Sequence, residues 1–235
     1  MDESRSEGHQ GRAECRKHEV PACLSVVLHE AAGRVKQRTF ASSKSAPVFK
    51  GRESYFVKHK IIPILKKKDI PKEYRRNPIG LLLEYHNLNR PFDTYSQARL
   101  LIGMCMDNRK HLHMPDNFAF IIRSGGANLR SSEFKVSYAI AVGQVRHIAL
   151  ICHNHCGMVN LVSRKKEFVD GLVNRAGWRK EAAEEHFMNL ALMHEIGNEI
   201  DFIMSETNRL RKRYPKIKVA PLYYRVEDNR LHCIR

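Results

Sequence analysis

The fold of this chain follows from three apolar segments, ARLLIGMCM (residues 98–106), FAFIIR (118–123) and VRHIALICH (145–153). Short runs of this kind are typical of strands that are covered on both faces. The last two flank SSEFKVSYAIAVGQV (131–145), a helical pattern whose first serine can cap it. Strands that alternate with a helix in this way predict an α/β fold, in which helices flank a mainly parallel central sheet.

Further elements are expected on either side of these segments. NPIGLLLEYHNLNR (77–90) has a proline near its start and apolar residues on one face, which predicts a helix. A longer helix is predicted over residues 181–213, with core residues at helical spacing: Leu190, Met193, Ile196 and Ile200. The chain closes with KIKVAPLYYRV (216–226) and RLHCI (230–234), which predict a terminal pair of strands.

The composition of the chain changes near residue 75. Residues 1–50 mix polar and charged side chains with little periodicity, so we expect them to be partly disordered. We therefore divide the 235 residues into a basic, partly disordered N-terminal extension or arm at 1–76 and a folded domain at 77–235.

The net charge is strongly positive. The chain has 41 lysines and arginines against 25 acidic residues, which gives a formal charge of +16 at pH 7. Much of it comes from two clusters, at 58–76 and 209–218, and such clusters can bind nucleic acid or acidic membranes. No nucleic-acid-binding motif accompanies them, so a solvated basic surface is the favoured interpretation.

Cysteine usage and the N-terminal residues indicate the compartment. The six cysteines are scattered, at positions 15, 23, 105, 152, 156 and 233, which fits a reducing compartment better than a disulfide framework. The first residues, MDESRSEGHQ, lack the apolar region of a secretory signal, and the sequence has no apolar run long enough to cross a membrane. We therefore expect a soluble, cytoplasmic protein.

Cys105, His153 and Cys156 have the types and the spacing of a three-ligand zinc site. Zinc binds thiolates and imidazoles in tetrahedral geometry, and a catalytic site leaves one position open. Cys105 and His153 fall at the carboxyl ends of predicted strands, where open α/β sheets gather their binding groups. A closed structural site with a fourth ligand is the alternative, and three residues could supply that ligand: Asp107, Cys152 and His155.

Asp107 and Arg109 lie just past the first of these strands, two residues apart. In an extended loop this spacing puts both on one side, where they can form a bidentate ion pair. A carboxylate held in this way could accept a hydrogen bond from water at a metal, whereas the alternative is an ordinary surface salt bridge. Zinc makes hydroxide available at neutral pH, and carbon dioxide is the obvious small electrophile for it.

These motifs resemble the β-class carbonic anhydrases. The resemblance covers residues 77–235, and its most specific part is the ordered pair of Cys-x-Asp-x-Arg and His-x-x-Cys. The matching segments are CMDNR (105–109), IIRSGGAN (121–128), SYA within the predicted helix (137–139), HNHCG (153–157) and the closing segment 222–231.

The resemblance implies a zinc enzyme, a lyase of the carbonate dehydratase type, that reversibly converts carbon dioxide into bicarbonate and a proton through zinc-bound hydroxide. Cys105, His153 and Cys156 would be the metal ligands of a β-carbonic anhydrase-like zinc domain, and the catalytic Asp107 would pair with Arg109. Its partner would be a small-molecule substrate, carbon dioxide or bicarbonate.

The resemblance also implies an assembly and an alternative substrate. Members of the family form homodimers or multiples of dimers, and the helix at 77–90 would be the N-terminal helical arm that embraces the partner. Asn108 and the segment 123–126 depart from the usual family residues. With Met158 after Cys156 and Gly157, the chain resembles a branch of the family that includes hydrolases of carbonyl sulfide and carbon disulfide. A third alternative is a non-catalytic zinc module whose basic arm binds nucleic acid or lipid.

Overall fold

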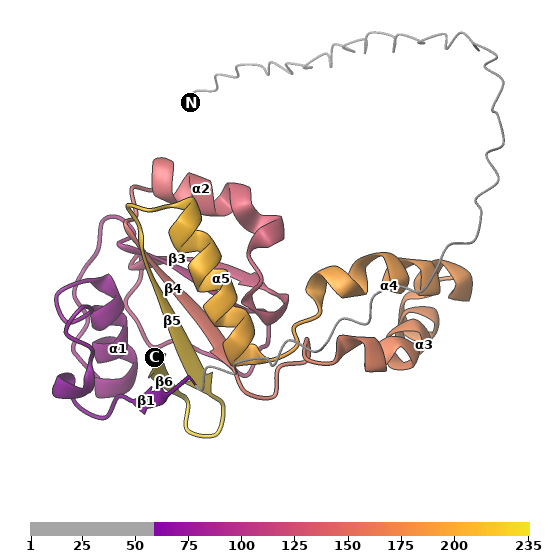
Figure 1. The fold of residues 1–235 in the computed structure, drawn as a ribbon, viewed down its shortest axis with the longest axis horizontal. Coiled ribbons are helices and arrows are strands. Elements are labelled where there is room, and N and C mark those ends of the chain that lie inside the picture. The colour runs from indigo at the N-terminus through magenta and orange to yellow at the C-terminus, as the bar shows by residue number, and fades with distance from the viewer. Residues whose placement is uncertain (1–58) are drawn as a thin grey trace, which may run out of the picture. The chain divides into compact units, whose positions relative to one another are not determined.

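The computed structural model describes residues 59–235, in which a mixed sheet has the strand order β1-β6-β5-β4-β2-β3 (Figure 1). Its six strands are β1 (Ile61–Pro63), β2 (Leu100–Cys105), β3 (Ala119–Ser124), β4 (His147–His153), β5 (Lys218–Arg225) and β6 (Arg230–Ile234). The strands β3, β2, β4 and β5 run parallel, whereas β6 and β1 are antiparallel to their neighbours. The predicted α/β fold with a mainly parallel sheet and a terminal strand pair is therefore confirmed.

Helices cover both faces of the sheet (Figure 1). On one face, α1 (Pro78–Leu88) packs Leu82 and Leu83 against β2 and β4. On the other face lie α2 (Glu133–Ala141) and α5 (Glu199–Arg213), with Ile203 of α5 in the core. Because successive residues of a strand point to opposite faces, the central strands β2 and β4 need apolar residues at almost every position, as their sequences provide.

The helix at 77–90 forms as predicted. Asn77 caps α1 by accepting hydrogen bonds from the backbone N–H groups of Ile79 and Gly80, and Pro78 occupies the first turn. A Cβ on Gly80 would lie 2.1 Å from the carbonyl oxygen of Tyr74, so only glycine allows this approach. The helix packs into the core of its own chain, and its embrace of a partner stays a prediction.

The folded unit begins earlier than the predicted boundary at residue 77. Strand β1 pairs with β6, and Ile64 and Ile70 are fully buried in the core on the α1 side of the sheet. Residues 59–76 therefore belong to the folded unit and not to an arm. The disorder predicted for 1–50 lies outside the described residues, and binding of nucleic acid or membranes by the basic arm stays a prediction. Within residues 59–235, no helix is long and apolar enough to cross a membrane.

The single long helix predicted over 181–213 is two helices in the structure. Helix α4 (Lys180–His194) ends before the segment 195–198, and Asn198 caps the new helix α5 by accepting from the N–H groups of Ile200 and Asp201. The interruption changes the predicted core, because Met193 is 59% exposed whereas Ile196 is buried outside either helix.

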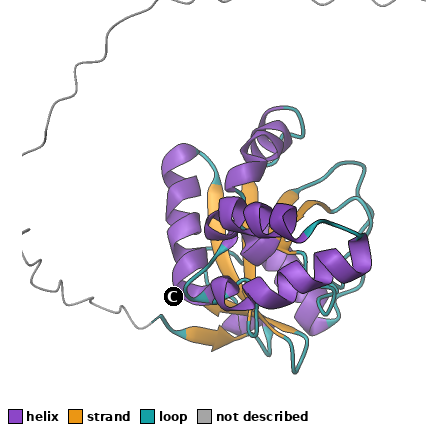
Figure 2. Cartoon of the chain, turned by 90° about the vertical axis from the view of Figure 1, so that its right-hand side faces the viewer, coloured by secondary structure: helices purple, strands orange, loops and turns teal. Residues whose placement is uncertain are grey.

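Helix α3 (Lys165–Ala176) was not predicted, and it pairs with α4 (Figures 1 and 2). The ring of Phe168 packs against that of Phe187, with centroids 5.2 Å apart. Short 3-10 helices connect the larger elements: η1 (Lys67–Asp69), η2 (Gly125–Ala127), η3 (Arg130–Ser132) and η4 (Leu161–Arg164).

Two local expectations about the sheet and its helix are also corrected. Strand β3 is at the edge of the sheet, so Phe120 and Ile121 are exposed and the strand is not covered on both faces. The N-cap position of α2 is occupied by Ser132 and not by the first serine, Ser131, and the Ser132 side chain makes no capping hydrogen bond.

His86 of α1 makes the stability of the fold dependent on pH. Its Nδ1 accepts a hydrogen bond from the N–H of His113, and burial lowers the pKa of His86 from 6.5 to about 4. The unfolded chain binds this proton more readily, so the stabilisation is complete above pH 6.5 and is lost as the pH falls towards 4. We expect His86 to lower the free energy of unfolding by roughly 3 kcal/mol over that range.

Urea unfolding of the wild type and His86→Gln at pH 7 and at pH values down to 4 measures this contribution. The variant should lose less stability on acidification than the wild type, because glutamine has no proton to bind. The same loss in both proteins would exclude His86 as its source.

Candidate metal centre

The three predicted zinc ligands come together at the carboxyl edge of the sheet. Cys105 ends β2, His153 ends the neighbouring parallel strand β4, and Cys156 lies in the loop that follows. All three are buried, and one ligand atom from each lies within 4.8 Å of the others. The parallel pairing of β2 with β4 therefore joins two motifs that are far apart in the sequence.

His153 is oriented to present a lone pair to this cluster. Its Nδ1 lies 2.8 Å from the carbonyl oxygen of Asn154, so Nδ1 carries the proton and donates. Its Nε2 is buried and has no hydrogen-bond partner among residues 59–235. A buried acceptor without a donor is costly, and a metal ion would satisfy it.

The geometry of the two thiols fits zinc. Their sulfur atoms, Cys105 Sγ and Cys156 Sγ, are 3.9 Å apart. A tetrahedral zinc ion with Zn–S bonds of about 2.3 Å holds two sulfurs about 3.8 Å apart. The cluster therefore needs little rearrangement to hold the ion.

The candidates for a fourth ligand are engaged elsewhere. Asp107 is paired with Arg109, Cys152 Sγ hydrogen-bonds to the carbonyl of Leu222, and the exposed His155 lies 3.3 Å from Glu227. Within residues 59–235 the metal-binding group comprises Cys105, His153 and Cys156 alone. This arrangement favours a centre with one open position over a closed structural site.

The two thiols share a proton unequally. The hydrogen bond between them lowers the pKa of Cys105 and raises the pKa of Cys156. Because a thiolate is the form that binds zinc, Cys105 is prepared as a ligand before the metal arrives. Binding would then release the remaining proton from Cys156.

Asp107 and Arg109 form the predicted bidentate ion pair. The Arg109 guanidinium donates from Nε to Oδ1 (3.0 Å) and from Nη2 to Oδ2 (2.6 Å), and the Arg109 backbone N–H also donates to Oδ1. The guanidinium holds the pKa of Asp107 far below its ordinary value. Asp107 Oδ2 lies 4.0 Å from His153 Nε2, so the carboxylate borders the cluster.

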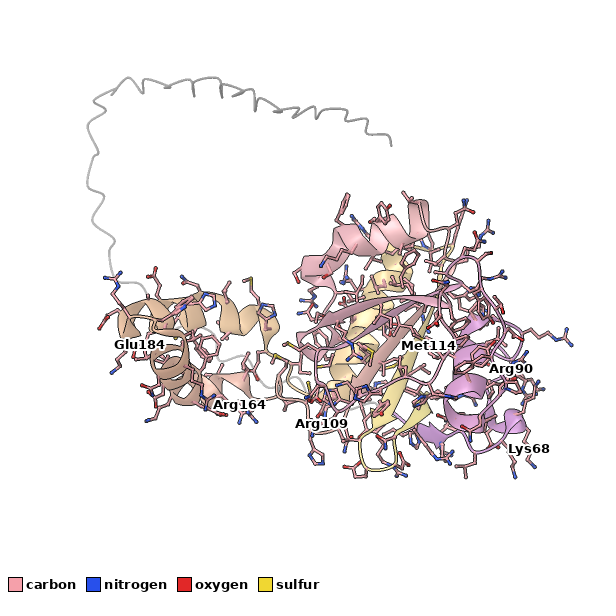
Figure 3. The ribbon with its side chains drawn as sticks, turned by 180° about the vertical axis from the view of Figure 1, so that it is seen from behind. Lys68, Arg90, Arg109, Met114, Arg164 and Glu184 are labelled. Carbon is pink, nitrogen blue, oxygen red and sulfur yellow. The ribbon has the colours of Figure 1, made fainter. Side chains whose placement is uncertain are left out.

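Arg109 also ties the two motif loops together. Its Nη2 donates to the carbonyl oxygen of His155 at 2.9 Å, between the ligands His153 and Cys156. Figure 3 shows Arg109 at the end of the sheet nearer to α3 and α4. The pair therefore joins the loop after β2 to the loop after β4.

Sequence reasoning missed the role of Arg123. From β3 its Nη1 donates to the carbonyls of Cys105 and Asp107, each at 3.3 Å, and its Nη2 donates to that of Lys110 at 3.1 Å. One side chain thus holds the loop that carries the first ligand. The parallel pairing of Cys105 with Ser124, next to Arg123, is the signal that could have found it.

Two further residues near the centre carry no sequence signal. Lys110 follows Arg109 and is fully buried, with Nζ 3.7 Å from Asp107 Oδ1. Glu199, at the start of α5, accepts a hydrogen bond from the N–H of Cys156 at 3.3 Å. Both lie outside the spacing patterns of the motifs, because only the tertiary structure brings them to the cluster.

An apolar cavity of about 300 Å³ lies beside the centre. Met106 and Met158, which follow the two cysteine ligands closely in sequence, both line it, and Met158 packs with the buried cysteines. Phe168 of α3 and Phe187 of α4 close its other side. The helix pair that the sequence did not predict thus lines an apolar cavity together with Met106 and Met158, which lie close in sequence to Cys105 and Cys156.

Comparison with known proteins gives similarity at the level of structure. No family model and no curated protein matches the sequence. A carbonic anhydrase from Glaciozyma antarctica has 22% identity, with 58% of this chain and 83% of that chain covered and a TM-score of 0.47.

Two further solved structures are similar. The β-carbonic anhydrase isoform I of Trichomonas vaginalis has 17% identity, covering 61% of this chain and 87% of that chain, with a TM-score of 0.48. The apo form of a carbon disulfide hydrolase has 20% identity, covering 57% and 77% of the two chains, with a TM-score of 0.42. The solved structures similar to this chain thus include β-carbonic anhydrases and a carbon disulfide hydrolase, the two kinds of protein whose motifs it resembles.

Proposed function

We propose that the protein is a zinc enzyme that reversibly hydrates carbon dioxide to bicarbonate and a proton. One observation carries this proposal: three ligand atoms within 4.8 Å of one another, beside a carboxylate that Arg109 orients. Zinc held there by Cys105, His153 and Cys156 would supply a nucleophile from water at neutral pH.

The residues of the chain position the reactants. Asp107 stays ionised because of its pair with Arg109, so it accepts a hydrogen bond from the attacking water and directs a lone pair of that water towards the carbon. The apolar cavity lined by Met106 and Met158 suits an uncharged linear substrate. Polar groups of the chain therefore orient the water, and apolar groups bind the electrophile.

Hydrolysis of carbonyl sulfide or carbon disulfide is the alternative on the same centre. Both are uncharged and linear, as carbon dioxide is, and the sulfur atoms of Met106 and Met158 give the cavity a polarizable lining. The same nucleophile and the same carboxylate would serve either reaction.

A stopped-flow assay on protein of known zinc content separates these reactions. Carbon dioxide hydration in proportion to bound zinc supports the first proposal. Release of sulfide from carbonyl sulfide or carbon disulfide, without carbon dioxide turnover, selects the alternative. If zinc-loaded protein has neither activity, the non-catalytic zinc module is the remaining alternative.

The proposal includes a homodimer or a multiple of dimers in the cytoplasm. Large apolar side chains gather at the edge strand β3 and on α2, and they are exposed: Phe120, Ile121, Phe134, Tyr138 and Val142. Such a patch is typical of a protein interface. The cysteines of residues 59–235 are all free, which supports a reducing compartment.

Light scattering after size-exclusion chromatography tests the assembly. The wild type should elute as a dimer or larger species, and Phe134→Glu should shift it towards the monomer, because Phe134 is 81% exposed in the single chain. Met188→Glu, at an exposed position on α4, serves as the control. A wild type that is monomeric at all concentrations would exclude the dimer.

A further inference from the structure

Lys110 is the only buried lysine among residues 59–235. Its side chain has no exposed surface, and its Nζ has no hydrogen-bond partner in the described chain. The nearest carboxylate oxygen, Asp107 Oδ1, is 3.7 Å away and already accepts two hydrogen bonds from Arg109. An ammonium group in this state is costly to bury, so its presence beside the centre requires a physical reason.

The surrounding chain keeps Lys110 in place. Arg123 donates to the carbonyl oxygen of Lys110, and it also donates to those of Cys105 and Asp107. Burial lowers the pKa of Lys110, while the nearby Cys105, Asp107 and Cys156 raise it. The ammonium therefore lies beside the carboxylate of Asp107, which itself borders the cluster at His153 Nε2.

The charges of the centre do not balance without an anion. The two positive charges of a zinc ion are offset by the thiolates of Cys105 and Cys156, and His153 is neutral as a ligand. Asp107 and Arg109 offset one another, and the positive charge of Arg123 is offset by the negative charge of Glu199. One positive charge remains, that of Lys110, and a single monovalent anion at the open position would neutralise it.

We propose that Lys110 is the counter-ion for a small monovalent anion bound at the metal centre. The inference rests on the proposed function, since it requires a metal held by Cys105, His153 and Cys156. It adds that the centre selects its anionic ligands by charge: bicarbonate after hydration of carbon dioxide, or hydrosulfide after hydrolysis of a sulfur-containing substrate. An uncharged ligand gains nothing from Lys110.

Cobalt-substituted full-length protein allows a direct measurement. Thiocyanate and bicarbonate are titrated as anionic probes and imidazole as a neutral probe, and the visible absorption of the cobalt ion reports the dissociation constants. Lys110→Met should raise the dissociation constants of both anions by about tenfold or more, because it removes a charge from a poorly solvated site. The dissociation constant for imidazole should change much less, and Lys216→Met, which removes an exposed charge, should change none of them.

Lys110→Gln provides a second neutral side chain in case the methionine variant does not fold. Anion dissociation constants within twofold of wild type in a folded, cobalt-loaded variant would overturn the role of Lys110. An equal rise in the dissociation constant for imidazole would also overturn this role, because it would indicate a general distortion of the site. A failure of the proposed function alone gives another result. The wild type would bind anions through Lys110 but would turn over no substrate. A wild type that binds no cobalt would overturn both.

Discussion

Replacement of Asp107 by asparagine should lower the rate of carbon dioxide hydration by about 100-fold or more while zinc stays bound. Asparagine keeps the size of the side chain, but it cannot form the charged bidentate pair with Arg109. Its amide also presents a donor where the carboxylate accepts. The loss should therefore appear in kcat at every pH, because the wild-type carboxylate is ionised throughout the working range.

Stopped-flow kinetics with parallel zinc analysis measures the effect of Asp107→Asn. Asn108→Ser is the matched control, since Asn108 is exposed in the same loop and makes no side-chain hydrogen bond within residues 59–235. Near wild-type turnover in Asp107→Asn would remove the proposed role of the carboxylate. Loss of zinc from that variant would instead make Asp107 a residue of the metal site.

Cys156→Ala should lose both zinc and activity. Loss of an outer partner of a metal ligand lowers metal affinity by about 10- to 100-fold, so loss of a thiolate ligand should lower it further. The remaining pair, Cys105 and His153, cannot complete a tetrahedral site. We expect zinc content to fall from one ion per chain to near zero after dialysis against a weak chelator.

Cys152→Ala is the control for this substitution. Cys152 is buried on the same strand as His153, but its side chain packs in the core between the sheet and helices α2 and α5. The variant should therefore keep its zinc, with only the modest loss of stability that a smaller core side chain brings. Equal zinc loss in both variants would mean that the ion depends on the fold in general and not on Cys156.

The positions of the three candidate ligands were predictable from the sequence because they depend on features of single segments. A strand ends where its apolar run ends, and parallel strands place their carboxyl ends at one edge, so Cys105 and His153 could be expected to meet. The spacing between His153 and Cys156 and the spacing between Asp107 and Arg109 can likewise be read within a single segment. The observed bidentate pair agrees with that reasoning.

The helical region after residue 180 was harder to predict. A helical apolar pattern continues through the segment 195–198, so periodicity alone does not reveal that the chain breaks there. The break is set by Asn198, which caps a new helix, and by Ile196, whose backbone joins that of Val159. This second contact links segments that are distant in the sequence.

The sequence by itself determined the α/β class with its mainly parallel sheet, and it predicted that Cys105, His153 and Cys156 meet at one edge of that sheet. The tertiary structure alone decided that residues 59–76 join the core, that Arg123 clamps the ligand loop and that Lys110 is buried beside Asp107. The physical reason is the distance along the sequence over which each kind of information acts. Periodicity and motif spacing act within one segment, whereas the burial and charge environment of a side chain depend on every segment that folds around it.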